Sequence, residues 1–145
     1  MKQIAEKILE AKSQKQLSWV ELAEQIGKSP VWVTSALLGQ NSMSAPDAQK
    51  ICSCLGLGKD VEVALQQCPM KGSLEQAVPV DPLIYRFYEI IQVYGTTIKE
   101  LVHEEFGDGI MSAIDFEMDI AREQNPKGDR VIITLNGKFL PYRQW

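Results

Sequence analysis

Two charged side chains lie three residues apart in a segment that is expected to be helical. Arg86 and Glu89 follow Asp81-Pro82, where an aspartate cap and a proline at the first helical position begin a helix. Residues three apart on a helix are neighbours, and a guanidinium presents a planar fork that matches carboxylate-like anions. The spacing alone nevertheless favours a surface ion pair worth roughly a few tenths of a kcal/mol.

A second candidate is a hydroxyl on a predicted strand. Residues 110–120 alternate between two classes of side chain with a period of two, and Ser112 shares the face of Ile110 and Ile114. That face is expected to be buried, so the hydroxyl needs a hydrogen-bond partner or a ligand. A structural serine bonded within the fold is the favoured interpretation, and a ligand contact is the alternative.

The other polar candidates have simpler interpretations. His103, the only histidine, is expected to be a helix-end residue near the negative end of the helix dipole. Alternation places Asp115, Glu117 and Asp119 on the polar face of the strand, where a solvated face is favoured over a cation site. The sequence contains no phosphate-loop, dinucleotide or zinc-hydrolase motif.

The three cysteines, Cys52, Cys54 and Cys68, form no spaced framework, which indicates reduced thiols in a reducing compartment. On a helix, Cys52 and Cys54 point to nearly opposite sides and cannot share one metal ion. We therefore expect small buried apolar residues and no metal site.

The elements that position these residues fall into two regions. Residues 1–77 predict an all-α bundle in which capping residues, prolines and glycines mark the helix ends. Ser18 to Glu21 is a capping box, Ser29-Pro30 begins another helix, and Gly56 ends a fourth. The predicted helices cover approximately residues 2–15, 18–26, 30–38, 44–55 and 59–67.

Residues 68–82 hold three prolines and predict a linker, and residues 78–145 predict a small helix-plus-strand domain. Its first helix is expected to end at Gly95, and a second, capped at Thr97, to end at Gly107. The strand over residues 110–120 follows, and then a hairpin that turns at Asn136-Gly137. The fold class is therefore α+β, and such a poor independent sheet predicts pairing with a second chain.

The first region also has the helix, glycine turn and second helix of a helix-turn-helix, with a second helix over residues 30–38. That helix carries no positive charge, and residues 1–77 balance eight Lys/Arg against eight Asp/Glu. Because phosphate neutralisation requires a basic surplus, we expect a repressor-like packing module that does not bind nucleic acid.

The chain has 145 residues, and its hydrophobic fraction of 45% with 23% charged residues indicates a soluble folded protein. No apolar run approaches the roughly 20 residues of a membrane span. The first residues alternate charged and apolar side chains without a signal-peptide core, which predicts a cytoplasmic protein without membrane partners.

Several motifs of the second region resemble the signature of the cyanase family, whose members are also called cyanate lyases or cyanate hydratases. The resemblance extends over essentially the whole chain, because the family also carries an amino-terminal repressor-like bundle. The matching segments include Asp81-Pro82-Leu83-Ile84-Tyr85-Arg86-Phe87-Tyr88-Glu89, Gln92-Val93-Tyr94-Gly95, Phe106-Gly107-Asp108-Gly109-Ile110, Ser112-Ala113-Ile114 and residues 131–141.

The resemblance implies a bicarbonate-dependent decomposition of cyanate to ammonia and carbon dioxide by way of carbamate. It places the family's catalytic residues on Arg86, Glu89 and Ser112, with no metal and no cofactor besides bicarbonate as co-substrate. It also implies a homodecamer built from intertwined dimers, with active sites between dimers. The alternatives are a helix-turn-helix transcriptional regulator with a C-terminal dimerisation module, and an inactive scaffold that retains the fold.

Overall fold

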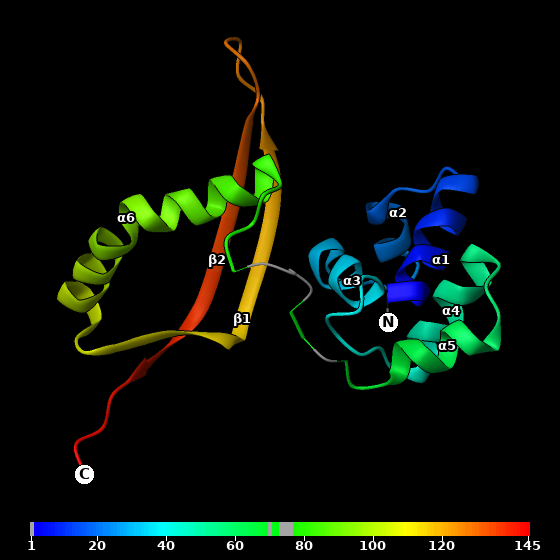
Figure 1. The fold of residues 1–145 in the computed structure, drawn as a ribbon, viewed down its shortest axis with the longest axis horizontal. Coiled ribbons are helices and arrows are strands. Elements are labelled where there is room, and N and C mark those ends of the chain that lie inside the picture. Colours follow the sequence, from blue (N-terminus) through cyan, green and yellow to red (C-terminus); the bar gives the residue numbers. More distant parts are fainter. Residues whose placement is uncertain (1, 70, 73–76) are drawn as a thin grey trace. The chain divides into compact units, whose positions relative to one another are not determined.

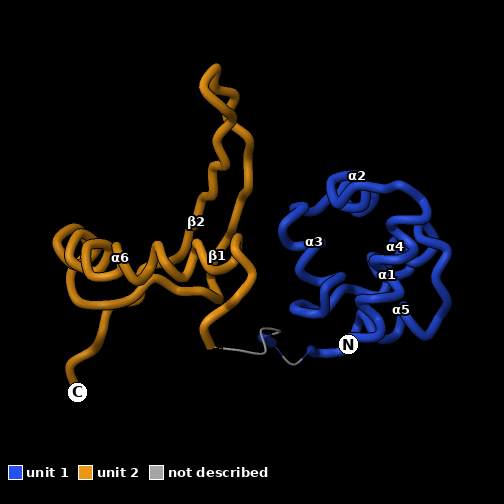
Figure 2. Tube along the Cα trace, turned by 45° about the horizontal axis from the view of Figure 1, so that its top comes forward, with its two compact units in different colours: residues 1–73 blue, residues 74–145 orange. Residues whose placement is uncertain are grey.

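The computed structural model describes residues 2–69, 71–72 and 77–145 (Figure 1). The chain divides into two compact units, residues 1–73 and residues 74–145, which we call the N-terminal unit and the C-terminal unit (Figure 2). Among the residues that the structure describes, the first contains helices only, and the second contains one helix followed by two strands. The predicted α+β class is confirmed.

The N-terminal unit is a bundle of five short helices. α2 packs against α3, α4 packs against α5, and α1 contacts α4. Their fully buried side chains are aliphatic and include Leu22, Leu37 and Ile51. Each such side chain contributes about 1.5–3 kcal/mol by leaving water, so this unit has a sufficient core of its own. The helices are α1 (Lys2–Gln14), α2 (Trp19–Glu24), α3 (Pro30–Leu37), α4 (Ala45–Leu55) and α5 (Lys59–Gln66).

The helix ends of this unit follow the predicted capping signals. The Ser18 hydroxyl accepts a hydrogen bond from the Glu21 amide at 3.1 Å, and the Glu21 carboxylate accepts from the Ser18 amide at 2.7 Å. Gly56 ends α4 with a φ of 70°, a left-handed conformation that glycine adopts without strain. Ser29 stands at the start of α3, but its side chain makes no cap hydrogen bond. The predicted capping box is confirmed.

The C-terminal unit begins with one long helix, α6 (Pro82–Phe106), where two helices were predicted. The Asp81 carboxylate caps it by accepting from the Leu83 and Ile84 amides, both at 3.0 Å. The predicted end at Gly95 is wrong, because ending a helix there requires a left-handed glycine and Gly95 has no positive φ. A glycine inside a helix costs about 1 kcal/mol, which does not interrupt a helix of 25 residues. α6 changes direction along its length (Figure 1).

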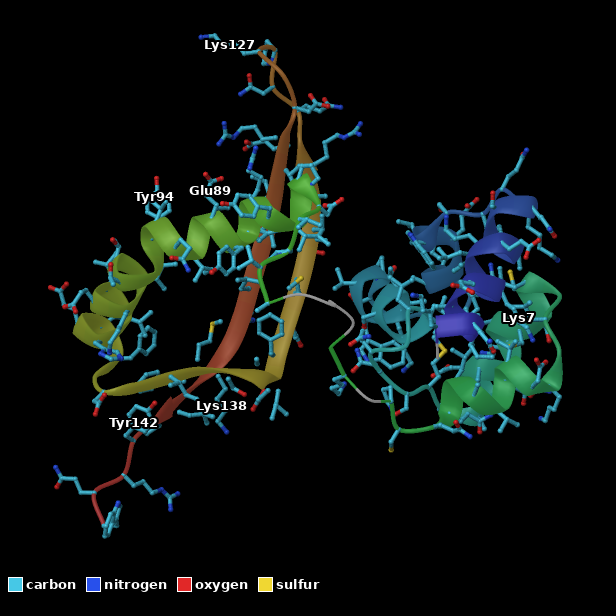
Figure 3. The ribbon with its side chains drawn as sticks, in the orientation of Figure 1. Lys7, Glu89, Tyr94, Lys127, Lys138 and Tyr142 are labelled. Carbon is cyan, nitrogen blue, oxygen red and sulfur yellow. The ribbon has the colours of Figure 1, made fainter. Side chains whose placement is uncertain are left out.

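The sheet of this unit is a single antiparallel hairpin of β1 (Gly109–Glu123) and β2 (Arg130–Pro141). The predicted turn at Asn136-Gly137 is wrong, because both residues lie inside β2 and pair with β1. The chain turns instead at residues 124–129, where Lys127 marks the tip (Figure 3). There the Asn125 carboxamide oxygen accepts from the Lys127 amide at 2.9 Å, and Gly128 has a φ of 119°.

The C-terminal unit leaves most of its large apolar side chains exposed. Among the described residues, the buried aliphatic side chains all lie between Ile8 and Leu65, and α6 buries none of its residues. Within the described part of the chain, no helix is long and apolar enough to cross a membrane. The exposed apolar residues of α6 include Leu83, Ile84, Phe87, Ile90, Ile91, Val93, Ile98, Leu101 and Phe106.

Candidate active site

The first part of the candidate site lies on the N-terminal half of α6. The nearest nitrogen of the Arg86 guanidinium is 3.5 Å from a Glu89 carboxylate oxygen, and the two side chains are 62% and 51% exposed. Figure 3 shows Glu89 extending outward from the helix. A pair this exposed contributes little to stability. Because both side chains reach solvent, their charges are accessible to a ligand.

Two tyrosines border the ion pair. The guanidinium carbon of Arg86 lies 5.9 Å from the centroid of the Tyr85 ring, and the Tyr85 and Tyr88 rings are 6.2 Å apart. A guanidinium over an aromatic face is held in orientation by the electrostatic attraction of the ring. The face of α6 that carries Arg86 therefore presents an oriented cation beside apolar ring surface.

The second part of the candidate site is Ser112, which is only 6% exposed in a C-terminal unit that buries few residues. Its hydroxyl oxygen accepts hydrogen bonds from the Ile114 amide at 3.1 Å and the Asp115 amide at 2.9 Å. A hydroxyl has two acceptor positions and one proton to donate. Among the described residues, none accepts that proton, so Ser112 is bonded as the structural interpretation requires and still has a free donor.

A bulge in β1 creates this geometry. Met111 pairs with Phe139 and Phe116 pairs with Gly137, so that residues 112–115 of β1 lie opposite the single residue Lys138 of β2. The alternation predicted for residues 110–120 is therefore wrong across this segment. Ile114, expected on the buried face beside Ser112, is 98% exposed. Bulges redirect side chains in this way and are frequent beside active sites.

Within one chain, the two parts of the candidate site are not joined by a direct bond. Among the described residues, no hydrogen bond, ion pair or ring contact joins Ser112 to Arg86 or Glu89. Nothing in the alternating pattern marks a bulge, so the sequence does not point to the amides of Ile114 and Asp115 as hydrogen-bond donors to Ser112.

The junction between α6 and β1 is held by His103, which lies in the last turn of α6 as predicted. Its Nδ1 is 3.2 Å from the Lys99 ammonium and its Nε2 is 3.1 Å from the Gly109 carbonyl oxygen. An ammonium only donates and a carbonyl only accepts, so this arrangement fits a neutral ring protonated at Nε2. The Phe106 and Phe139 rings, 5.3 Å apart, add an apolar contact at this junction.

The cysteines are free, and among the described residues no group of three or more His, Cys, Asp or Glu could hold a metal ion. Cys52 is buried in the core of the N-terminal unit, and this burial raises the pKa of its thiol to about 11. It is therefore a core residue in its protonated form, as expected, and not a nucleophile.

The two units match two family models. Residues 1–69 match the family model described as "Cyanate hydratase, N-terminal", and residues 76–144 match the model described as "Cyanate lyase C-terminal domain". Neither description is that of a DNA-binding regulator.

Individual relatives are similar in sequence to this chain over nearly its full length. A cyanate hydratase of Thiobacillus denitrificans is 61% identical over 143 residues, which are 99% of this chain and 97% of that protein. A cyanate hydratase of Teredinibacter turnerae is 54% identical over 142 residues, 98% of this chain and 97% of that protein. The crystal structure of a cyanase from T. urticae superposes with a TM-score of 0.84 at 41% identity, covering 95% of this chain and 96% of that one.

Proposed function

This chain belongs to the cyanate hydratase family, and we propose that it decomposes cyanate to ammonia and carbon dioxide with bicarbonate as co-substrate. The observation that carries the proposal is the match of both units to family models, together with 61% identity to a cyanate hydratase over 99% of the chain. The exposed Arg86–Glu89 pair and the free Ser112 donor supply the chemistry that two anionic substrates require.

The reaction begins when a bicarbonate oxygen attacks the cyanate carbon. The new C–O bond gives a mixed anhydride. The cyanate nitrogen becomes an amino group by taking up two protons, one from the bicarbonate hydroxyl and one from outside the two substrates. Cleavage of the original bicarbonate C–O bond then releases carbon dioxide and leaves carbamate. Carbamate takes a further proton and separates into ammonia and a second carbon dioxide. All three steps, the attack, the release of the first carbon dioxide and the breakdown of carbamate, are polar bond exchanges that require neither a metal ion nor an organic cofactor.

Arg86 offsets the repulsion between the two anions. Two like charges brought to contact repel strongly when water is excluded, and a fixed cation beside them removes most of that penalty. The planar guanidinium donates two parallel hydrogen bonds to a bicarbonate or carbamate group. Holding both substrates side by side supplies much of the rate by proximity.

Ser112 and Glu89 take complementary roles. Because both acceptor positions of the Ser112 hydroxyl are occupied by backbone amides, this hydroxyl donates its proton in a hydrogen bond to a substrate oxygen and orients that substrate. Glu89, 3.5 Å from the guanidinium, orients Arg86 and transfers a proton to the developing carbamate.

We further propose that the site is completed by other copies of the chain, in a decamer built from intertwined dimers. Exposed apolar surface on the scale of α6 and the hairpin marks an interaction surface. A site between chains also brings more than one Arg86 to two anions and excludes water. The helical N-terminal unit balances eight lysines against seven acidic residues, so it has no large basic surplus; it serves packing and does not bind nucleic acid.

The test is release of ammonia from cyanate by the purified oligomer, in buffer stripped of carbon dioxide and then with bicarbonate restored. We expect turnover only after bicarbonate is added. Full initial-rate activity in the stripped buffer would exclude the bicarbonate mechanism, and absence of activity in both buffers would favour the inactive scaffold. Salt-dependent selection of one DNA sequence would favour the regulator.

A further inference from the structure

Asn136-Gly137 has the sequence of a tight turn but lies in the interior of β2. Gly137 pairs with Phe116, the first residue of β1 that regains regular pairing after the bulge. A glycine inside a strand weakens it and is commonly found where another backbone segment approaches closely. The residues of β1 that face Gly137 explain why a glycine stands at this position.

The space beside Gly137 is filled by the residues of the bulge. A Cβ atom built on Gly137 would collide with the carbonyl oxygen of Ser112, well inside the 3.0 Å that Cβ atoms keep from other atoms. It would also lie 2.5 Å from Cγ and 3.1 Å from Sδ of Met111. The Met111 side chain is flexible and can move aside, but the Ser112 carbonyl belongs to the backbone that carries the hydroxyl.

We infer that Gly137 is a positioning residue for Ser112: the absent side chain lets β2 contact the bulge and fixes where the hydroxyl points. The inference rests on the proposed role of Ser112 as a donor to the substrate. Any side chain at position 137 pushes the Ser112 carbonyl away from β2. The hydroxyl moves with it, because its oxygen is tied to the Ile114 and Asp115 amides of the same bulge.

The first test is Gly137→Ala in the full-length oligomer. A misplacement of about 1 Å costs on the order of 100-fold in rate, so we expect kcat to fall by about that factor in a protein that still assembles. Its melting temperature should fall as well, because a backbone atom must move to admit the new Cβ. Asn136→Ala is the matched control, because it lies next in the same strand, is exposed and adds no atom toward the bulge. Wild-type activity of Gly137→Ala would overturn the inference.

The second test asks whether the loss passes through the Ser112 hydroxyl. In a double-mutant cycle, Gly137→Ala should cost nothing further once Ser112→Ala is present. Losses that multiply would overturn the inference, because Gly137 would then act on something other than Ser112. If Ser112→Ala itself keeps full activity, the proposed role of Ser112 fails. If Ser112→Ala is impaired and Gly137→Ala is not, only the role of Gly137 fails.

A milder variant covers the case in which Gly137→Ala does not assemble. Met111→Ala removes the side chain that a new Cβ would contact, so Met111→Ala/Gly137→Ala retains only the collision with Ser112. We expect an assembled protein with about 100-fold lower kcat than Met111→Ala alone. Equal activity of the two variants would overturn the inference. Failure of the double variant to assemble would also overturn it, because Gly137 would then be needed for folding.

Discussion

The N-terminal and C-terminal units have nearly equal lengths and opposite patterns of burial. Residues 1–73 enclose an aliphatic core, whereas α6 has no buried residue and much of the hairpin remains exposed. Apolar residues are plentiful in both units, so the difference does not come from composition. In the first unit they contact one another, and in the second they face outward, where we propose that other copies cover them.

The proposed active site lies in the unit that does not bury its own apolar surface. A site on a self-sufficient fold needs only its own side chains, but Arg86 and Ser112 make no contact with each other among the described residues of one chain. The proposed site therefore links catalysis to the proposed assembly of the C-terminal unit. The N-terminal unit supplies stability without contributing a proposed catalytic group.

The largest effect is expected from Arg86→Lys in the C-terminal unit. Lysine keeps the charge but loses the planar fork, so we expect the rate of ammonia release to fall by about 1000-fold with helical content unchanged. Arg122→Lys is the matched control, because Arg122 is another exposed arginine of this unit, 3.7 Å from Asp129 and outside the proposed site. Wild-type activity of Arg86→Lys would return Arg86 to the role of a surface ion pair.

The next largest effects are expected from removing one large apolar side chain in each unit, and these effects should depend differently on protein concentration. Leu37→Ala removes a fully buried side chain and should lower the free energy of unfolding of the N-terminal unit by about 2–5 kcal/mol at every protein concentration. Leu101→Ala, at an exposed position of α6, should instead weaken assembly, so that its effect grows on dilution. Denaturant unfolding followed by circular dichroism at several protein concentrations measures both. The contrast between the units is refuted if Leu101→Ala behaves identically at all concentrations.

A smaller effect is expected at the start of α2. Ser18→Ala removes the capping box and should lower the free energy of unfolding by about 1 kcal/mol. Ser29→Ala is the matched control, because Ser29 starts α3 without a side-chain hydrogen bond and should change stability by less than about 0.5 kcal/mol. Equal losses for the two variants in denaturant unfolding would show that the Ser18 hydroxyl does not act as a cap.

The last prediction concerns the reactivity of two thiols of the N-terminal unit, which is tested without any substitution. With a pKa of about 11, Cys52 is almost entirely protonated at pH 8, and the unreactive form dominates because the thiolate is the nucleophile. Iodoacetamide at pH 8 should therefore label the exposed Cys68 and leave Cys52 unlabelled, as read by mass spectrometry of peptides. Labelling of Cys52 should begin only as the pH rises toward 11. Fast labelling of both at pH 8 would contradict a closed core.

The sequence predicts helix ends better than strand connections, because caps are local and strand contacts are not. The Ser18 capping box and the Asp81-Pro82 start depend on residues within three positions, and both are confirmed. Gly95 and Asn136-Gly137 carry the same residue types as real ends and turns, but their φ values and strand pairing depend on residues far along the chain. Asn125-Pro126, where the chain does turn, is an equally good turn signal in the sequence.

In the candidate site too, the local contact could be predicted from the sequence and the strand geometry could not. The neighbouring positions of Arg86 and Glu89 follow from helical spacing, and their contact is confirmed at 3.5 Å. The burial of Ser112 was predicted, but for a regular strand face. The structure buries Ser112 in a bulge whose partner is Gly137, and no local pattern encodes that bulge.

We propose that Arg86 and Ser112 of different chains form each active site, and mixed oligomers test this proposal most directly. Arg86→Ala and Ser112→Ala chains carrying different tags are produced together, and oligomers that hold both tags are purified and assayed for ammonia release from cyanate with bicarbonate. Each variant alone should be nearly inactive, and the mixed oligomer should regain activity well above the sum of the two, because some of its sites combine an intact Arg86 with an intact Ser112. Mixed oligomers as inactive as the two parents would contradict the account.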